Sequence, residues 1–269
     1  MGNTKIVNSI QRATRILELL SQGNERLEDI YPKVDLSRST THRLLKSLVA
    51  SGLAAQNPID RRYHIGPKFL QITASPLTAH RILSICAYQE LIRLRDLSGE
   101  STLIIVPNGI HRLVVKMIPS LETILFSWPD GNTVPIYLGS AGKVLLAQMD
   151  ENERDILLRA IDMVPRTPNT IVDRDILKKE LEKILRQGYA TSFGESFSGG
   201  AGISVPVQNY VCPVALCISG PEFRFNPEDY FEEMKTSAER ISHTLAFYYK
   251  RPGREGNQTN RENRRNSTY

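Results

Sequence analysis

The sequence predicts an α+β protein with a small, mostly helical N-terminal domain and a larger mixed domain. Three amphipathic segments and two short strand-forming segments fall within the first 75 residues. Further along, helical periodicity alternates with strands that follow one another closely, which favours antiparallel pairing over a doubly wound sheet. We assign domains to residues 1–75 and 99–250, a linker helix to 76–98, and a disordered basic tail to 251–269.

The first domain is expected to open with two helices and a tight turn. A helix over residues 9–20 begins at Asn8 or Ser9, both good N-caps. A short helical segment over 27–31 leads to Asp35, a residue type that tolerates the left-handed backbone of such turns. Helical spacing predicts the buried stripe of the first helix as Ile10, Ala13, Ile16, Leu17 and Leu20.

Residues 36–52 separate into two faces when drawn as a helix. Ser37 can cap this helix and Gly52 stands where it would end. The apolar face holds Thr41, Leu44, Leu45 and Leu48, and the opposite face holds Ser39, His42, Arg43 and Lys46. The pattern fits an ordinary solvated amphipathic helix, and it also fits a helix that enters a DNA major groove.

The flanking segments favour the second interpretation. Strands over 53–56 and 63–65, joined by a turn over 57–62, would form a hairpin after the third helix. This order is that of a winged helix-turn-helix. We expect bases to be read by Ser39, Thr40, His42 and Arg43. We expect phosphates to be contacted by Arg38, Lys46, Arg61 and Arg62, and we expect Arg12 to be a further DNA-binding residue.

The second domain is predicted to mix strands and helices. Strands are expected over 101–106, 112–118, 123–127, 189–193, 203–207 and 214–218. Helices are expected over 140–148, 151–161, 174–186 and 227–249.

The basic character of the chain is concentrated at its two ends. Residues 1–75 carry 11 Lys and Arg against 6 Asp and Glu, and the tail over 251–269 carries 5 against 2. The middle, residues 76–250, carries 18 against 21. A basic head on a slightly acidic body favours a polyanion-binding module over a uniformly basic enzyme.

Several other classes of protein find no support in the sequence. No apolar stretch is long enough to cross a membrane and no leader pattern opens the chain, so a cytoplasmic protein without a membrane partner is expected. Cys86, Cys212 and Cys217 show no metal-ligand spacing and read as unpaired thiols. His111 and His243 stand isolated, so we expect no catalytic group, no metal and no cofactor.

The segment Gly139-Ser-Ala-Gly-Lys143 has three interpretations. It is not a P-loop, because Tyr137 occupies the earlier glycine position and Val144 follows the lysine. It also lacks the G-x-S-x-G pattern of a nucleophile elbow. A helix N-terminus with free N–H groups at Ser140 and Ala141 would suit an anion, and a tight turn of small residues is the plain alternative.

The chain resembles the IclR family of bacterial transcriptional regulators over residues 8–248. The resemblance implies a winged helix, a helical linker and a sensing domain related to GAF and profilin-like folds. Two positions depart from the family pattern: Pro32 stands where a helix former is expected, and Asp35 where glycine is usual. The matching stretches are 9–13, 36–45, 63–67, 139–147, 188–189 with Glu195, 203–206 and 217–221.

The resemblance also implies an effector pocket beside the 139–143 turn. Many relatives have an acid near position 193 and a cysteine near 203, where this chain has Phe193 and Ile203, so an apolar wall is expected. Glu195 is either a ligand contact or a surface carboxylate, and Cys217 is a buried strand residue rather than a reactive thiol. The implied pocket residues are Val134, Ser140, Ala141, Phe193, Glu195, Ile203, Cys217 and Ser219.

Together these observations predict a DNA-binding transcriptional regulator that responds to a small organic acid. Its partners would be a pseudo-palindromic double-stranded operator, the effector, and further copies of the chain in a homodimer or dimer of dimers. Two other classes remain open: a metabolic enzyme with a GAF-like domain, and a nucleoid protein that binds DNA without sequence specificity.

Overall fold

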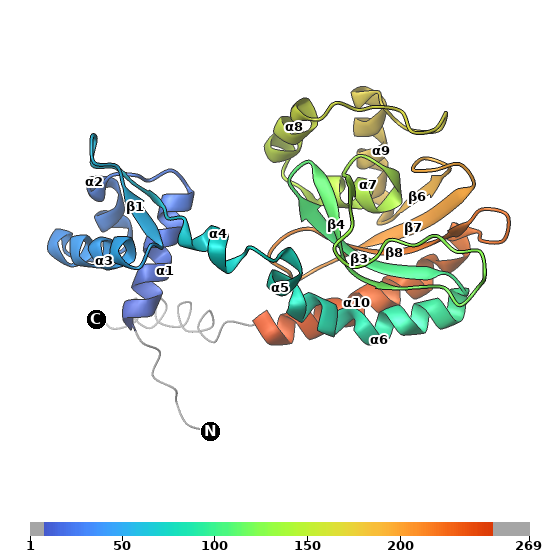
Figure 1. The fold of residues 1–269 in the computed structure, drawn as a ribbon, viewed down its shortest axis with the longest axis horizontal. Coiled ribbons are helices and arrows are strands. Elements are labelled where there is room, and N and C mark those ends of the chain that lie inside the picture. Colours follow the sequence, from blue (N-terminus) through green and yellow to red (C-terminus); the bar gives the residue numbers. More distant parts are fainter. Residues whose placement is uncertain (1–7, 250–269) are drawn as a thin grey trace, which may run out of the picture. The chain divides into compact units, whose positions relative to one another are not determined.

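The computed structural model describes residues 8–249, which divide into two compact units between Ala79 and His80 (Figure 1). The predicted tail, residues 251–269, lies outside the described residues. The elements of the N-terminal unit are α1 (Asn8–Ser21), α2 (Leu27–Ile30), a 3-10 turn (Tyr31–Lys33), α3 (Arg38–Ala50), β1 (Ala54–Gln56), β2 (Tyr63–Ile65), α4 (Lys68–Ile72) and α5 (Pro76–Ala79).

The N-terminal unit confirms the predicted order of helices and hairpin. Strands β1 and β2 pair antiparallel, from Ala54 opposite Ile65 to Gln56 opposite Tyr63. The prediction for the buried stripe of α1 was wrong at Ile10, which is 66% exposed, while Leu19 is buried instead. The core of this unit consists of Ile16, Leu19, Leu20, Ile30, Leu45, Leu48, Ala54 and Tyr63.

The two departures in the helix-turn-helix have local structural consequences. Pro32 lies in the 3-10 turn, and α2 spans only Leu27–Ile30. Proline has no N–H to donate and disrupts a helix interior, so the chain tightens instead of continuing α2. Asp35 has φ 52°, the left-handed conformation expected of it.

The larger unit is an α+β domain, as predicted, and it is built on a six-stranded sheet. The sheet order is β5-β4-β3-β8-β7-β6, and every neighbouring pair is antiparallel. Its strands are β3 (Ser101–Asn108), β4 (His111–Ile118), β5 (Thr133–Pro135), β6 (Ala190–Phe193), β7 (Gly200–Val207) and β8 (Val214–Pro221). Its helices are α6 (Arg81–Ser98), α7 (Gly139–Gln148), α8 (Glu151–Ala160), α9 (Arg174–Gln187) and α10 (Phe231–Tyr249), the last preceded by a 3-10 turn (Pro227–Tyr230).

Helices cover both faces of the sheet (Figure 1). On one face α6 and α10 pack against side chains such as Ile104 and Ile203. On the other face α7 and α9 pack against side chains such as Leu103 and Cys217. Because successive residues of a strand point to opposite faces, a shift of one residue decides which layer a side chain joins.

The strand predicted over 123–127 does not form, and the prediction was wrong there. The segment is a loop between β4 and β5, and strand β5 comes later. Its carbonyl groups accept hydrogen bonds from side chains instead of a neighbouring strand: Ser101 Oγ donates to Phe126 O and Arg224 Nη2 to Ile124 O. The aromatic ring of Phe126 lies against that of Phe197 in a tilted arrangement, with 4.8 Å between the ring centroids.

The helix predicted as a linker is two separate elements. At His80 the backbone leaves helical geometry, with φ −99° and ψ 13°, so α5 ends before α6 begins. Helix α6 belongs to the larger unit, because its buried side chains lie in the core beneath the sheet. These buried side chains are Leu83, Ala87, Leu91 and Leu94.

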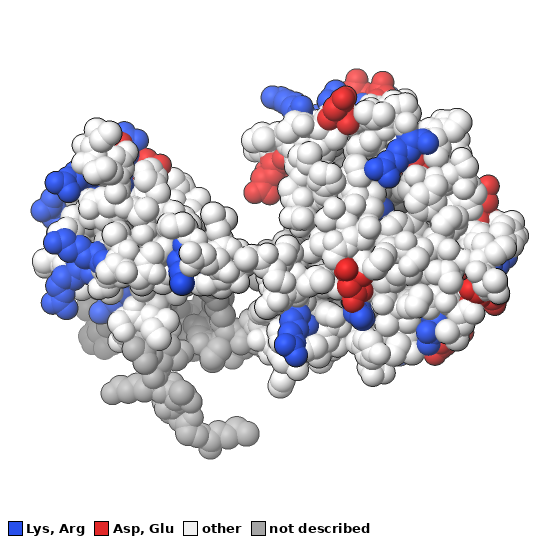
Figure 2. Space-filling view, viewed as in Figure 1, with Lys and Arg blue, Asp and Glu red and all other residues white. Residues whose placement is uncertain are grey.

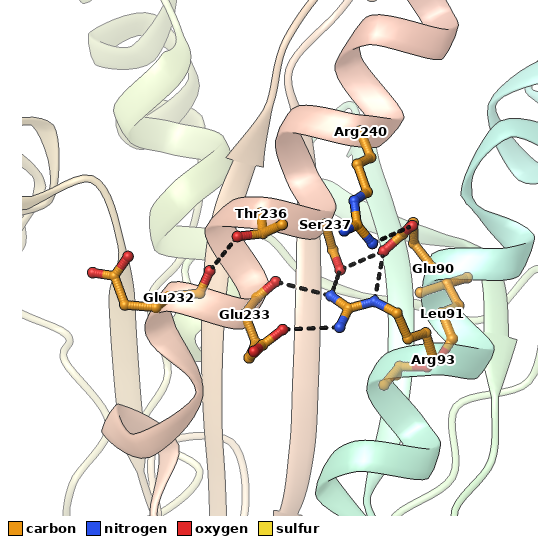
Figure 3. Close-up of polar contacts among 9 residues, drawn as sticks. Glu90, Leu91, Arg93, Glu232, Glu233, Thr236, Ser237 and Arg240 are labelled. Atoms are coloured by element: carbon orange, nitrogen blue, oxygen red, sulfur yellow. Dashed lines mark hydrogen bonds and ion pairs between the residues drawn. The ribbon is translucent and has the colours of Figure 1, made fainter.

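A polar network also holds α6 against α10 (Figure 3). Arg93 Nη1 of α6 donates to Glu233 Oε2 of α10 at 2.8 Å, and its Nη2 donates to Ser237 Oγ at 2.6 Å. Ser237 Oγ donates to Glu90 Oε2 at 2.7 Å. Burial raises the pKa of Glu90, but the hydrogen bonds from Ser237 and Arg93 outweigh it and leave that pKa below its ordinary value.

Within residues 8–249, none of the helices combines the length and the apolar character that a membrane span requires.

Candidate functional site: a basic winged helix and a separate cavity

The third helix of the N-terminal unit presents the predicted polar face to solvent. Ser37 caps it as expected, since its Oγ accepts a hydrogen bond from the Thr40 N–H at 3.2 Å. Thr41 is fully buried beneath the helix, whereas Ser39, Arg43 and Lys46 are exposed and His42 is half-buried. The face of α3 that is predicted to read bases is therefore accessible from solvent.

A groove runs between α3 and the β1–β2 hairpin. It brings His42 and Lys46 of the helix together with Arg61 and Arg62 of the hairpin turn. Arg61 lies in the left-handed region, φ 61°, at the exposed turn. Figure 2 shows Lys and Arg side chains gathered on the N-terminal unit where α3 lies.

Two of the predicted phosphate contacts are paired with acids of the same unit. Arg38 Nη2 lies 2.9 Å from Glu28 Oε1, an exposed pair that a phosphate can replace. Arg62 lies 3.1 Å from Glu25 and 3.5 Å from Asp60. Arg61 has no such partner among residues 8–249, so it is the freer cation of the turn.

A second surface depression lies between α1 and α3. Arg12 of α1 lines this surface together with Thr40 and Arg43 of α3. Two guanidinium groups and a hydroxyl thus face one concave strip. Sequence reasoning missed Arg26 and Gln56, which line the α3–hairpin groove; the alternation within the hairpin could have indicated Gln56.

The larger unit contains a cavity between α7 and the sheet. It occupies about 420 Å³ including its opening to solvent. Its apolar wall comes from Leu103, Ile105, Trp128 and Phe197, with the Trp128 and Phe197 rings stacked 5.2 Å apart. The other residues lining it are Arg112, Gly139, Ser140, Ala141, Ser192, Ser196, Gly200, Ala201, Gly202, Cys217 and Ser219.

The N-terminus of α7 lies against this cavity, as the third interpretation of the 139–143 segment predicts. Gly142 is required there, because a Cβ would lie 1.9 Å from Ile136 O. Ser140 Oγ is 2.9 Å from Ser204 Oγ of β7. Of the first three N–H groups of α7, that of Gly139 donates to the carboxylate of Glu195, and those of Ser140 and Ala141 have no acceptor within residues 8–249.

Glu195 is neither a cavity-lining residue nor a surface carboxylate. Its side chain is buried, and Oε1 accepts a hydrogen bond from Lys143 Nζ at 2.7 Å. Lys143 Nζ also donates to Thr191 O at 2.8 Å. Burial raises the pKa of Glu195, and Lys143 acts against that shift. The ion pair between Lys143 and Glu195 therefore stabilises the 139–143 turn without lining the cavity.

Three more of the predicted pocket residues lie outside the cavity. Phe193 and Ile203 are each one position from the residues that line it, Ser192 and Gly202. One residue along a strand reverses the face, so Ile203 lies in the core beside α6 and α10, and Phe193 is 44% exposed. Val134 is buried in β5 but does not reach the cavity.

Four predicted residues do line the cavity: Ser140, Ala141, Cys217 and Ser219. Cys217 is buried, and burial raises the pKa of its thiol, in agreement with an unreactive strand residue. Sequence reasoning missed Ser192, Ser196, Trp128 and Phe197, which lie on loops or strand ends. It also missed Arg112, although an arginine in phase with Val114 in an apolar strand was a usable indication.

Arg112 is the most unusual side chain of the cavity. It is 7% exposed, and its Nε has no hydrogen-bond partner. No hydrogen bond or ion pair of its guanidinium occurs within residues 8–249. Burial lowers the pKa of Arg112.

A basic winged helix joined to a domain that has its own partly apolar cavity is the architecture of a ligand-binding transcriptional regulator. The comparisons with known proteins agree. The family model for the IclR helix-turn-helix domain matches residues 9–58, and that for the bacterial transcriptional regulator IclR C-terminal domain matches residues 77–243. The chain therefore belongs to the IclR family, whose curated members are named as transcriptional regulators and not as enzymes.

Individual relatives match over nearly the whole chain. The HTH-type transcriptional repressor AllR of Escherichia coli is 30% identical over 251 residues, covering 90% of this chain and 92% of AllR. The structure of Thermotoga maritima IclR matches with TM-score 0.59 and 28% identity, covering 88% of this chain and 98% of that one. An IclR homologue from Microbacterium hydrocarbonoxydans, complexed with 4-hydroxybenzoate, shares the fold with TM-score 0.58 at 23% identity, covering 88% and 98%.

Proposed function

We propose that this regulator binds a pseudo-palindromic operator as a dimer or dimer of dimers, and that a small organic acid in the cavity of the larger unit alters its DNA affinity. The carrying observation is that one chain joins an exposed basic helix in one unit to a largely apolar cavity with unsatisfied donors in the other. A protein that binds DNA without specificity has no need of the second feature.

The DNA-binding half of the proposal rests on the exposed face of α3. Ser39, Thr40, His42 and Arg43 would face base edges in the major groove, with Arg12, Arg38, Lys46 and Arg61 at phosphates. Arg62 would contribute less than we expected from the sequence, because Glu25 and Asp60 already neutralise it. This face is suited to sequence-specific binding.

The effector half rests on the composition of the cavity. Leu103, Ile105, Trp128 and Phe197 supply the apolar wall that the sequence assigned to other residues. The N–H groups of Ser140 and Ala141 at the start of α7 favour an acceptor group. A small acid with an aromatic or branched body fits both features, and a protein of the same fold holds 4-hydroxybenzoate.

The assembly follows from the size of the DNA-binding unit. A single winged helix buries about 600–1,000 Å² on DNA, which is little for tight specific binding. Helix α6 cannot supply the dimer contact with its apolar stripe, because that stripe lies in its own domain core. Exposed apolar side chains of the N-terminal unit, Leu70 at 75% and Ile72 at 60%, are better suited to a contact between copies. Sedimentation of a monomer at micromolar concentration, free and on DNA, would contradict this.

A binding titration on the DNA upstream of the protein's own gene tests the proposed function. We expect retardation that unrelated DNA does not compete away, and an acid-induced change of about 1–3 kcal/mol in DNA-binding free energy. Retardation of every sequence alike would favour a nucleoid protein instead. Tighter binding of glyoxylate or pyruvate than of any aromatic or branched acid would overturn the apolar-cavity argument.

The Ala141→Asp variant tests the location of the effector site. A carboxylate at this helix start would repel an anionic ligand and remove the response to acid. DNA binding should remain near its original strength, with an unchanged melting temperature as the check on folding. A variant that still responds normally would place the effector elsewhere.

A further inference from the structure

Arg112 points into the effector cavity because of its register in β4. Val114, two residues along, packs with α7 and its neighbours, whereas Leu113 and Val115 pack with α6 and α10. Alternation along the strand therefore places Arg112 on the same face as α7. Its presence among the lining residues agrees with this register.

No group in the cavity neutralises this guanidinium. The residues that line the cavity include no Asp or Glu. The neighbouring Cys217 is buried in a way that favours the neutral thiol, and the other charge acting on Arg112 is the cation of Arg166. An arginine stays protonated in proteins, so the cavity holds a positive charge without a counterion.

The contrast with Lys143 shows that this is not a general property of the fold. Lys143 is the more deeply buried of the two at 2% exposure, and it is paired with Glu195 at 2.7 Å and with Thr191 O at 2.8 Å. A buried charge without a partner is costly. The unit satisfies that requirement for Lys143 and leaves it unmet for Arg112, which lies beside the apolar wall of the cavity.

We propose that Arg112 is the carboxylate-binding residue of the effector site, and that the effector is an organic acid whose carboxylate pairs with this guanidinium while its carbon body lies against Trp128 and Phe197. A second acceptor on the ligand would meet the N–H groups at the start of α7. The proposal rests on the effector site proposed above and specifies its ligand class. The planar guanidinium suits bidentate binding of a carboxylate.

The test compares the wild type with Arg112→Met by calorimetry. The probes are 4-hydroxybenzoate, phenylacetate and a branched 2-oxo acid, each with its neutral amide. The wild type should bind at least one acid about thirtyfold more tightly than the corresponding amide, and Arg112→Met should lose about that factor for the acid and little for the amide. Arg159→Met, a change at an exposed arginine of α8 that does not line the cavity, should bind like the wild type.

A ligand-free measurement keeps the test decisive. Methionine fills similar volume without the unpaired charge, so Arg112→Met should melt at the same or a higher temperature than the wild type when no acid is present. A large fall in melting temperature would assign Arg112 a structural role and overturn the proposal. So would equal acid binding by the variant, or failure of every acid to bind the wild type.

DNA binding separates this proposal from the proposed function. The Arg112→Met variant should bind the upstream DNA like the wild type and no longer respond to the acid. If the wild type shows no sequence-specific binding, the regulator proposal fails, while the calorimetric result for Arg112 can still be read.

Discussion

The arginines of α3 and the arginine of the cavity have the same charge and opposite surroundings. Arg43 is exposed to solvent and forms no ion pair within residues 8–249, whereas Arg112 is 7% exposed and its guanidinium has no hydrogen-bond or ion-pair partner among the same residues. Water and salt screen the first strongly and the second weakly. Exposed cations suit a polyanion that is bound through many modest contacts, and a buried one suits a single small anion.

A third cation, Lys143, completes the comparison, because it is buried and fully paired. Replacing Lys143 with methionine would leave Glu195 buried without its partner. We expect the free energy of unfolding to fall by about 3–5 kcal/mol in urea titrations. Lys178→Met is the matched control: its ion pair with Asp155 is partly exposed at 43% and 25%, so the loss should stay under about 1 kcal/mol. Equal losses would show that burial does not distinguish these pairs.

The exposed side of the comparison is tested at Arg43. Replacing Arg43 with alanine should weaken specific DNA binding by about 1–3 kcal/mol if it reads a guanine through two hydrogen bonds. Fluorescence anisotropy on operator and unrelated DNA measures affinity and specificity together. Arg159→Ala, an exposed arginine of α8, serves as the control and should change neither. Undiminished affinity and specificity in Arg43→Ala would mean that the orientation of α3 on DNA is wrong.

A charged network outside both sites gives a smaller, pH-dependent effect. The pKa of Glu90 lies below its ordinary value of 4.5, since the bonds from Ser237 and Arg93 outweigh burial. Its contribution to folding is therefore present at neutral pH and lost as pH falls through the lowered pKa. Glu90→Gln should be less stable than the wild type by about 1–3 kcal/mol at pH 7. That gap should narrow as the pH falls below 4.5 and close once it has fallen through the lowered pKa.

The control for the pH experiment is Glu239→Gln, an exposed acid of α10. Urea titrations across the acid range should show no pH-dependent gap between this variant and the wild type. A Glu90→Gln gap that stays constant down to the acid limit would contradict the role given to the Glu90 carboxylate.

The smallest effect distinguishes two adjacent cations of the hairpin turn. Arg61→Ala should weaken binding to all sequences alike and flatten the plot of log affinity against log salt by about one unit. Arg62→Ala should flatten it less, because Arg62 already lies 3.1 Å from Glu25. Equal slopes for the two variants would show that the Glu25 pair does not persist on DNA.

Helical periodicity and turn chemistry were sufficient to predict the winged helix. The Ser37 cap, the apolar stripe of α3 and the left-handed Asp35 are local features, so the sequence carries them directly. The segment over 123–127 was predicted to be a strand because its residues favour β-structure. In the described part of the chain no neighbouring strand pairs with it, so it forms a loop. The carbonyl of Ile124 instead accepts a hydrogen bond from Arg224, a hundred residues away along the chain.

The cavity was harder to predict, because a strand's facing depends on its register. The predicted cavity residues Phe193 and Ile203 are each one position away from the residues that line the cavity, Ser192 and Gly202. Because side chains alternate along a strand, this shift of one residue turns both side chains away from the cavity. The apolar wall was expected but came from loops and from β3, which local patterns cannot bring together. Arg112 escaped notice because its lack of a partner is a property of the folded cavity and not of the sequence.

Measuring Arg43→Ala and Arg112→Met in both binding assays tests most directly whether the two arginines serve separate functions. Anisotropy on the upstream DNA and calorimetry with the acid that binds the wild type would be run on the same preparations. We predict that Arg43→Ala loses DNA affinity and keeps acid binding, while Arg112→Met keeps DNA affinity and loses acid binding. A variant that loses both activities while remaining folded, or an Arg112→Met protein that binds the acid normally, would contradict this account.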